Sequence, residues 1–123
     1  LPAQAAVSID ATVLINEVYG GGGNNGAAFN RDFVELVNTG DTALDLGSWS
    51  VQYASATGTS WQVTPLTGMT IQPGGKLLVG QATGSNTTLP GFDADVEGRI
   101  PMSGTEGKVA LVDSAEALSG GTN

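Results

Sequence analysis

Residues 32–41 read Asp-Phe-Val-Glu-Leu-Val-Asn-Thr-Gly-Asp, and this stretch decides the fold. A dense run of β-forming side chains ends there in an Asn-Thr-Gly-Asp turn, where Asn and Gly accept positive φ at little cost. A short apolar segment follows, and residues 48–53 then alternate, with Trp49, Val51 and Tyr53 as the apolar set. This alternation predicts an antiparallel strand with one face in the core and the other in water.

The rest of the chain divides into similar short runs separated by turns rich in Gly, Pro and Asn. We predict strands at 12–19, 31–39, 43–46, 48–53, 60–64, 69–71, 76–81 and 108–113. The first of these is apolar on both faces, so we expect both faces to be covered. No window of helical length has a 3.6-residue period free of Gly and Pro, which predicts almost no helix. The predicted fold is all-β: an immunoglobulin-like antiparallel β-sandwich of about seven strands with long loops.

The order and spacing of five segments resemble the lamin tail domain, in particular the bacterial secreted branch of that family. The segments are 16–18, 33–38, 44–51, 71–79 and 104–113, and together they cover most of the chain. The resemblance implies an immunoglobulin-like sandwich used as a non-catalytic accessory module, often in the same polypeptide as a secreted nuclease or phosphatase. It also implies an extracellular or cell-surface location, with a neighbouring domain of the same polypeptide as the partner.

The resemblance divides the chain into three parts. Residues 1–11 are expected to be a flexible leader, and their small side chains are typical of the region around a signal-peptide cleavage site. Residues 12–113 form the lamin-tail-like sandwich. Residues 114–123 are a polar tail in which the family's usual closing strand is not recognisable, so that edge of the sandwich is expected to be unfinished or completed from outside this sequence.

Charge and composition exclude several classes of function. The chain has 123 residues and a formal net charge of -8, with only four Lys and Arg against twelve Asp and Glu. Such a surface repels phosphate backbones, so no nucleic-acid binding is expected from this domain alone. No apolar run is long enough to insert into a membrane. With no Cys and no His, and no recognisable catalytic motif, the domain is predicted not to be an enzyme.

Two acidic residues, Glu17 and Glu35, interrupt apolar rows of their predicted strands, with Glu17 assigned to the same side as Ile15. A carboxylate in such a row must be paired, hydrogen-bonded or bound to a metal, because unpaired burial is costly. One interpretation is that both carboxylates bind loop N–H groups or cations of the chain. The other is a calcium site completed by Asp32 and Asn38, since Ca²⁺ takes six to eight oxygen ligands. No other cofactor is predicted.

Two loops also allow both a structural and a ligand-binding interpretation. The glycine cluster at 20–26 lacks the context of a phosphate-binding motif, so we interpret it as a flexible loop. The acidic trio Asp93, Asp95 and Glu97 is interpreted as a solvated loop, with calcium binding as the alternative. Asn86 begins a glycosylation-type sequence, which indicates a surface loop.

The two tryptophans distinguish the accessory module from a second candidate function. If Trp49 and Trp61 lie exposed side by side, they form a stacking platform for a surface polysaccharide or protein partner, with or without calcium. If they are buried, they belong to the core. The sequence leaves both interpretations open.

Overall fold

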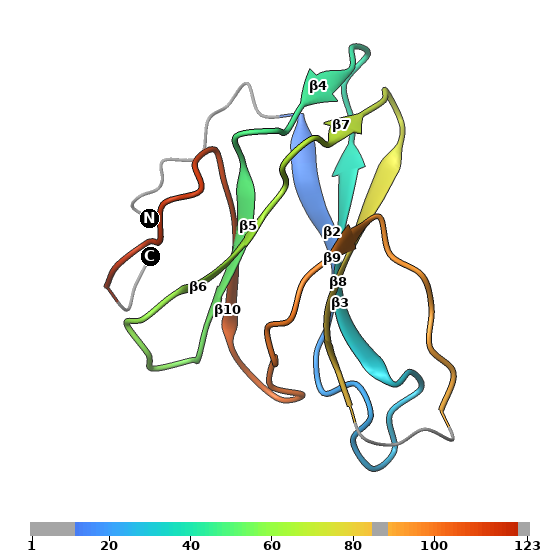
Figure 1. The fold of residues 1–123 in the computed structure, drawn as a ribbon, viewed down its shortest axis with the longest axis vertical. Helices are drawn as coiled ribbons and strands as arrows, with labels where there is room; N and C mark the ends of the chain where they lie inside the picture. The colour runs from blue at the N-terminus through green and yellow to red at the C-terminus, as the bar shows by residue number, and fades with distance from the viewer. Residues whose placement is uncertain (1–11, 85–88, 121–123) are drawn as a thin grey trace.

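The computed structural model describes residues 12–84 and 89–120, which form two β-sheets packed face to face (Figure 1). One sheet has the order β2-β3-β8-β9 and the other β10-β5-β6, while β4 and β7 form a small ribbon at one end. The strands are β2 (Val13–Tyr19), β3 (Arg31–Asn38), β4 (Leu44–Asp45), β5 (Ser50–Ala54), β6 (Gln62–Pro65), β7 (Thr70–Ile71), β8 (Lys76–Thr83), β9 (Val96–Glu97) and β10 (Lys108–Val112).

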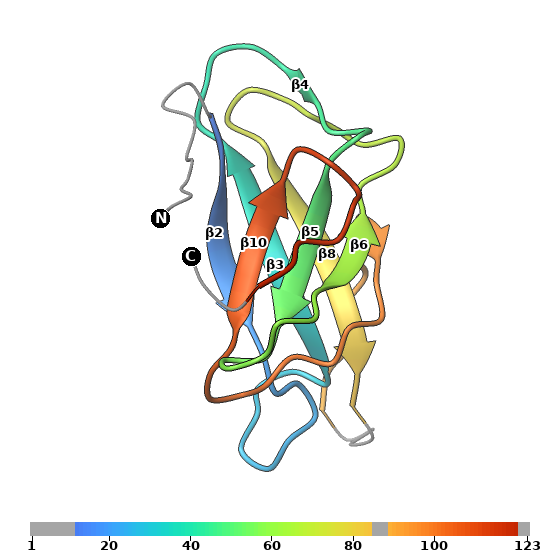
Figure 2. The same cartoon turned by 90° about the vertical axis from the view of Figure 1, so that its left-hand side faces the viewer.

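All strand pairs are antiparallel except β8 with β9. The sheet of β10, β5 and β6 lies in front of β2, β3 and β8 when the sandwich is viewed onto the flat face of its sheets (Figure 2). The predicted all-β sandwich is therefore confirmed. Within the described residues, the structure has no helix of the length and apolar character needed to cross a membrane.

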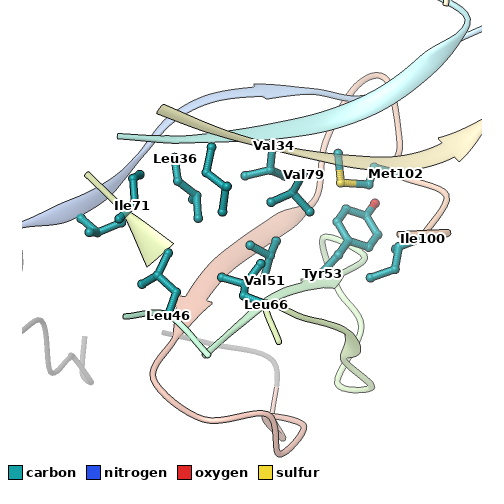
Figure 3. Close-up of a cluster of buried hydrophobic side chains, with 12 residues drawn as sticks. Val34, Leu36, Leu46, Val51, Tyr53, Leu66, Ile71, Val79, Ile100 and Met102 are labelled. Atoms are coloured by element: carbon teal, nitrogen blue, oxygen red, sulfur yellow. The ribbon is translucent and has the colours of Figure 1, made fainter. Parts of the chain in front are cut away.

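The core lies between the two sheets (Figure 3). Val34 and Leu36 of β3 and Val79 of β8 face Val51 and Tyr53 of β5, and all five side chains are buried. These positions follow the period of two expected for a strand with one face in the core. The predicted placement of the Val51 and Tyr53 face against the core is confirmed.

The predicted strands are all present, and no strand end is shifted by more than two residues. β9 was not predicted, because it has two residues and its neighbours show no alternation; it forms when Val96 pairs with Val79 of β8. The predicted leader at 1–11, the sequence beginning at Asn86 and the last residues of the tail lie outside the described residues.

The prediction for the first strand was wrong. β2 is an edge strand, and Leu14 and Val18 are 47% and 46% exposed. A bulge at Asn16 shifts the register, so Ile15 pairs with Leu36 on the core side while Glu17 pairs with Glu35 on the outer side. A bulge adds one residue to one strand and reverses which residues face inward. Glu17 therefore does not share a face with Ile15.

The outer face of the three-stranded sheet was also predicted incorrectly. Ser50 and Gln52 were expected to face water, but both are 0% exposed. Residues 113–120, which we call the strap, cross this face after β10 (Figure 2). Gln52 Nε2 donates to the Glu116 carbonyl at 2.8 Å, and Gln52 Oε1 accepts from the Leu118 N–H at 2.9 Å. The polar tail therefore covers a sheet face, although no further strand occurs in its described part.

Candidate interaction surface

The outer face of the four-stranded sheet carries two carboxylates on the neighbouring strands β2 and β3. Glu17 on β2 lies directly opposite Glu35 on β3, and Glu35 lies opposite Leu78 on β8. Asn16 Nδ2 donates to Glu35 Oε1 at 2.7 Å. No Lys or Arg of the described chain lies within 4.0 Å of either carboxylate, since the one ion pair found there joins Arg31 to Glu97. The cation pairing proposed for these two glutamates is absent from the described structure, and for Glu35 the partner is a side-chain amide.

The four calcium-ligand candidates do not converge. Asp32 and Asn38 lie at opposite ends of the core-facing side of β3, about 20 Å apart at 3.4 Å per residue. Glu17 and Glu35 are on the other face of the same sheet. Asn38 Nδ2 donates to the Thr42 and Ile71 carbonyls, and its Oδ1 accepts from the Gly40 N–H. Asn38 thus ties β3 to the β4–β7 ribbon. No group of three acidic side chains placed to hold a metal occurs at 12–84 or 89–120.

This separation gives an expectation for calcium. A ligand that binds only the folded state raises the free energy of unfolding by about 2.7 kcal/mol at a hundredfold excess over its Kd. We expect Ca²⁺ to give instead a small, non-saturating rise in melting temperature that Mg²⁺ reproduces at equal ionic strength. The measurement is thermal unfolding of EDTA-treated protein. A saturable, Ca²⁺-selective rise that Glu35→Gln abolishes would contradict the expectation.

The other half of this outer face is covered by an aromatic cluster. Tyr19 stacks on Phe33 at 5.3 Å between ring centroids, while Phe29 and Phe92 contact Phe33 edge-on. Aromatic pairs in these geometries contribute beyond their buried area. The Tyr19 hydroxyl accepts from the backbone N–H groups of residues 28 and 29, which fixes the loop onto the sheet.

Arg31 extends this cover toward β9. Its Nε donates to the Gln81 carbonyl at 2.9 Å, and its Nη2 lies 2.6 Å from Glu97 Oε1. The hydrogen bond and the charge of Arg31 lower the pKa of Glu97 below its ordinary value of 4.5. Asp95 Oδ2 accepts from the Leu78 N–H. Two members of the acidic trio therefore bind groups of the sheet, although all three residues are exposed, as the solvated-loop interpretation expected.

The glycine loop, residues 20–30, packs at one end of the sandwich through its backbone. Gly21 N–H donates to the Met102 carbonyl at 3.0 Å, and Gly22 N–H donates to Asp32 Oδ1 at 2.6 Å. Asp32 Oδ2 accepts from the Met102 N–H at 2.7 Å, so one buried carboxylate joins two loops. The prediction of a simple flexible loop misses this close packing. A hollow of about 370 Å³ lies beside it, and four of its lining residues are glycines.

The two tryptophans lie at opposite ends of the β5–β6 hairpin. Trp49 precedes Ser50, which pairs with Pro65, whereas Trp61 precedes Gln62, which pairs with Tyr53. Five residues along a strand separate the two levels, or about 17 Å. Both rings are partly buried; Trp49 packs against the core, and Trp61 Nε1 donates to the Gly120 carbonyl. They therefore do not form a side-by-side stacking platform.

The two tryptophans should respond differently to truncation. Trp49→Ala is expected to lower the free energy of unfolding by about 3 kcal/mol, the low end of the range for core aromatics, because the ring is partly exposed. Trp61→Ala should cost about 1 kcal/mol, since it removes a hydrogen bond to the strap and a contact with Lys108. Urea unfolding of both variants measures the difference. Equal losses would place Trp49 outside the core.

Comparison with known proteins shows one family. No curated protein and no solved structure matches the chain. A family model described as the lamin tail domain matches residues 6–120. The match includes the five segments singled out in the sequence, and it extends through the strap. The chain belongs to the lamin tail domain family.

Proposed function

We propose that this domain is an extracellular accessory module that tethers, positions or stabilises a neighbouring enzyme domain of the nuclease or phosphatase type in the same polypeptide. Lamin tail domains are in general immunoglobulin-like, non-catalytic interaction modules. The family match and the sandwich fold support the interaction role. The secreted setting and the enzyme neighbour rest on the resemblance to the bacterial branch.

The observation that carries the proposal is that the buried polar side chains form hydrogen bonds within the protein. All seven buried polar or charged side chains of the described residues form hydrogen bonds within the protein: Arg31, Asp32, Asn38, Ser50, Gln52, Thr64 and Gln81. Catalytic sites instead hold polar groups ready for a substrate. Here the hydrogen bonds of these groups connect the loops, the β4–β7 ribbon and the strap to the two sheets, as expected for a rigid scaffold.

The test uses the full-length gene product that contains this sequence. Deleting residues 12–120 should leave the kcat of the neighbouring domain within about twofold, because no group that contacts substrate is removed. The deletion should impair the secretion, surface retention or thermal stability of that enzyme. The isolated domain should not hydrolyse p-nitrophenyl phosphate or duplex DNA.

Two results would contradict the proposal. One is hydrolysis by the isolated domain that a single substitution abolishes. The other is a full-length protein whose stability, location and activity are all unchanged by the deletion. A core variant such as Leu36→Ala is the control, because it should reproduce the deletion only if the folded domain is what matters.

A further inference from the structure

We propose that the uncovered part of the outer face of the four-stranded sheet docks a basic protein surface, in which an arginine or lysine lies among apolar side chains. We call this part the open face; its residues are Leu14, Glu17, Glu35, Val37, Lys76 and Leu78. The inference rests on the proposed accessory role and specifies which surface performs it and what chemistry the partner presents.

The open face lacks the two covers that the described chain places over other parts of the outer sheet faces. The strap covers the outer face of β5, where Ser50 and Gln52 are buried. The aromatic cluster covers the lower half of the other outer face around Phe33, which is buried as well. Above that cluster, Leu14 is 47% exposed, although leucine is usually buried in a sheet.

Charge determines the kind of partner. Side chains directly opposite each other on neighbouring antiparallel strands have Cβ atoms about 5 Å apart, and like charges in such a pair are destabilising. Glu17 and Glu35 are such a pair, and no cation of the described chain lies within salt-bridge distance of them. A guanidinium or ammonium group placed over the pair would relieve the repulsion and form charge-assisted hydrogen bonds.

The surroundings of the glutamate pair favour a protein surface over a free cation. Leu14 and Val37 occupy the next row of the sheet, and Leu78 lies beside Glu35. An arginine or lysine side chain can bury its apolar stem along these residues while its charged end pairs with a carboxylate, and arginine is enriched at protein interfaces. A free cation would gain nothing from the apolar side chains. Lys76, opposite Val37, would repel a basic group and so directs the partner's cation toward the glutamates.

Two other occupants fit less well. A second copy of this chain, docked by the same face, would place two glutamates and one lysine against the same set, so two surfaces of net negative charge would meet. A strand added to the edge of β2 would meet the bulge at Asn16, and bulges at edge strands interrupt the regular row of backbone groups that such pairing needs. Charge complementarity therefore selects a basic partner that approaches the face of the sheet.

The experiment uses ¹⁵N-labelled protein and a synthetic peptide of alternating valine and arginine as the probe, at low ionic strength. We expect saturable chemical-shift changes at the backbone amides of 14–18, 34–37 and 76–78. In Glu17→Gln/Glu35→Gln the apparent Kd should rise by about tenfold or more, the typical effect of losing a paired charge. A peptide with glutamine in place of arginine should not bind.

A matched variant separates the open face from general charge. Glu106→Gln/Glu116→Gln removes the same two charges from exposed residues away from this face and should change Kd by less than about twofold. Both double variants should keep the wild-type melting temperature within a few degrees, because a glutamine substituted for Glu35 retains an oxygen that can accept from Asn16.

The outcomes distinguish the inference from the proposed function. Shift changes centred elsewhere, equal losses in the two double variants, or no saturable binding would each overturn the open face as the docking surface. The accessory role is measured separately by the domain deletion in the full-length protein. A positive deletion result with a failed peptide titration rejects this surface alone, and a negative deletion result with specific peptide binding rejects the accessory role alone.

Discussion

Gly22→Ala is expected to lower the free energy of unfolding by about 3 kcal/mol or more, or to prevent folding, although it adds one methyl group to a surface loop. A β-carbon at Gly22 would overlap the backbone nitrogen, carbonyl carbon and oxygen of Arg31. Backbone atoms cannot rotate away as a side chain can, so either the loop or the start of β3 must move. Movement of the loop would also break the Gly22 hydrogen bond to Asp32.

Gly91→Ala is the matched control. Gly91 lies in another exposed loop, its φ is not in the left-handed region, and a β-carbon there meets nothing within 4 Å. This variant should unfold within about 0.5 kcal/mol of wild type, as is usual for surface substitutions. Chemical denaturation followed by tryptophan fluorescence measures both. If Gly22→Ala were as mild as Gly91→Ala, the glycines would serve loop flexibility, as the sequence suggested, and not close packing.

The sandwich could be predicted from the sequence because its signals are local. In β5 the period of two places Val51 and Tyr53 in the core, and these residues do lie there. The turn after β3 was recognisable from its Asn and Gly, but the predicted reason was wrong, because neither Asn38 nor Gly40 has a positive φ. The Asn38 side chain instead accepts from the Gly40 N–H. Each of these signals depends on residues within one strand and the turn that follows it, so one sequence contains all the information needed.

The wrong predictions concern places where segments far apart in the sequence contact each other. Gln52 looked solvent-facing because nothing in its own strand shows that the strap, more than sixty residues later, crosses above it. Polar side chains on both segments suit an exposed surface as well as a hydrogen-bonded buried one. The bulge at Asn16 is a further case, because its effect on Glu17 depends on the register with β3.

The candidate site was predictable only where its signals are local to one strand. Glu17 and Glu35 were identified as unusual from their strands alone, and the structure places them directly opposite each other. Asp32 and Asn38 were grouped with them because all four carry oxygen ligands and lie near one another in the sequence. The alternation of β3 sends Asp32 and Asn38 toward the core and Glu35 outward, so closeness in sequence did not mean closeness in space.

Asp32→Ala is expected to be the other strongly destabilising substitution, with a loss of about 4 kcal/mol. Asp32 is buried and accepts hydrogen bonds from the N–H groups of Gly22 and Met102. Hydrogen bonds to a charged group contribute about 1.5–3 kcal/mol each, and removing the acceptor leaves one buried and one partly buried donor without a partner. The glycine loop and the loop around Met102 would then lose the side chain that joins them to β3.

Asp32→Asn tests this explanation against a role in metal binding. The asparagine oxygen can accept from one of the two N–H groups, but its NH₂ group faces the other donor, so the loss should be about half that of Asp32→Ala. Asp41→Ala is the control, since Asp41 is exposed and should change stability by less than about 0.5 kcal/mol. Urea unfolding in EDTA and in Ca²⁺ should give the same order of stabilities, because the carboxylate binds backbone donors in either buffer. A loss of unfolding free energy for Asp32→Ala that appears only in Ca²⁺ would show instead that the carboxylate acts through a metal ion. The link between the two loops would then not depend on the hydrogen bonds that Asp32 accepts.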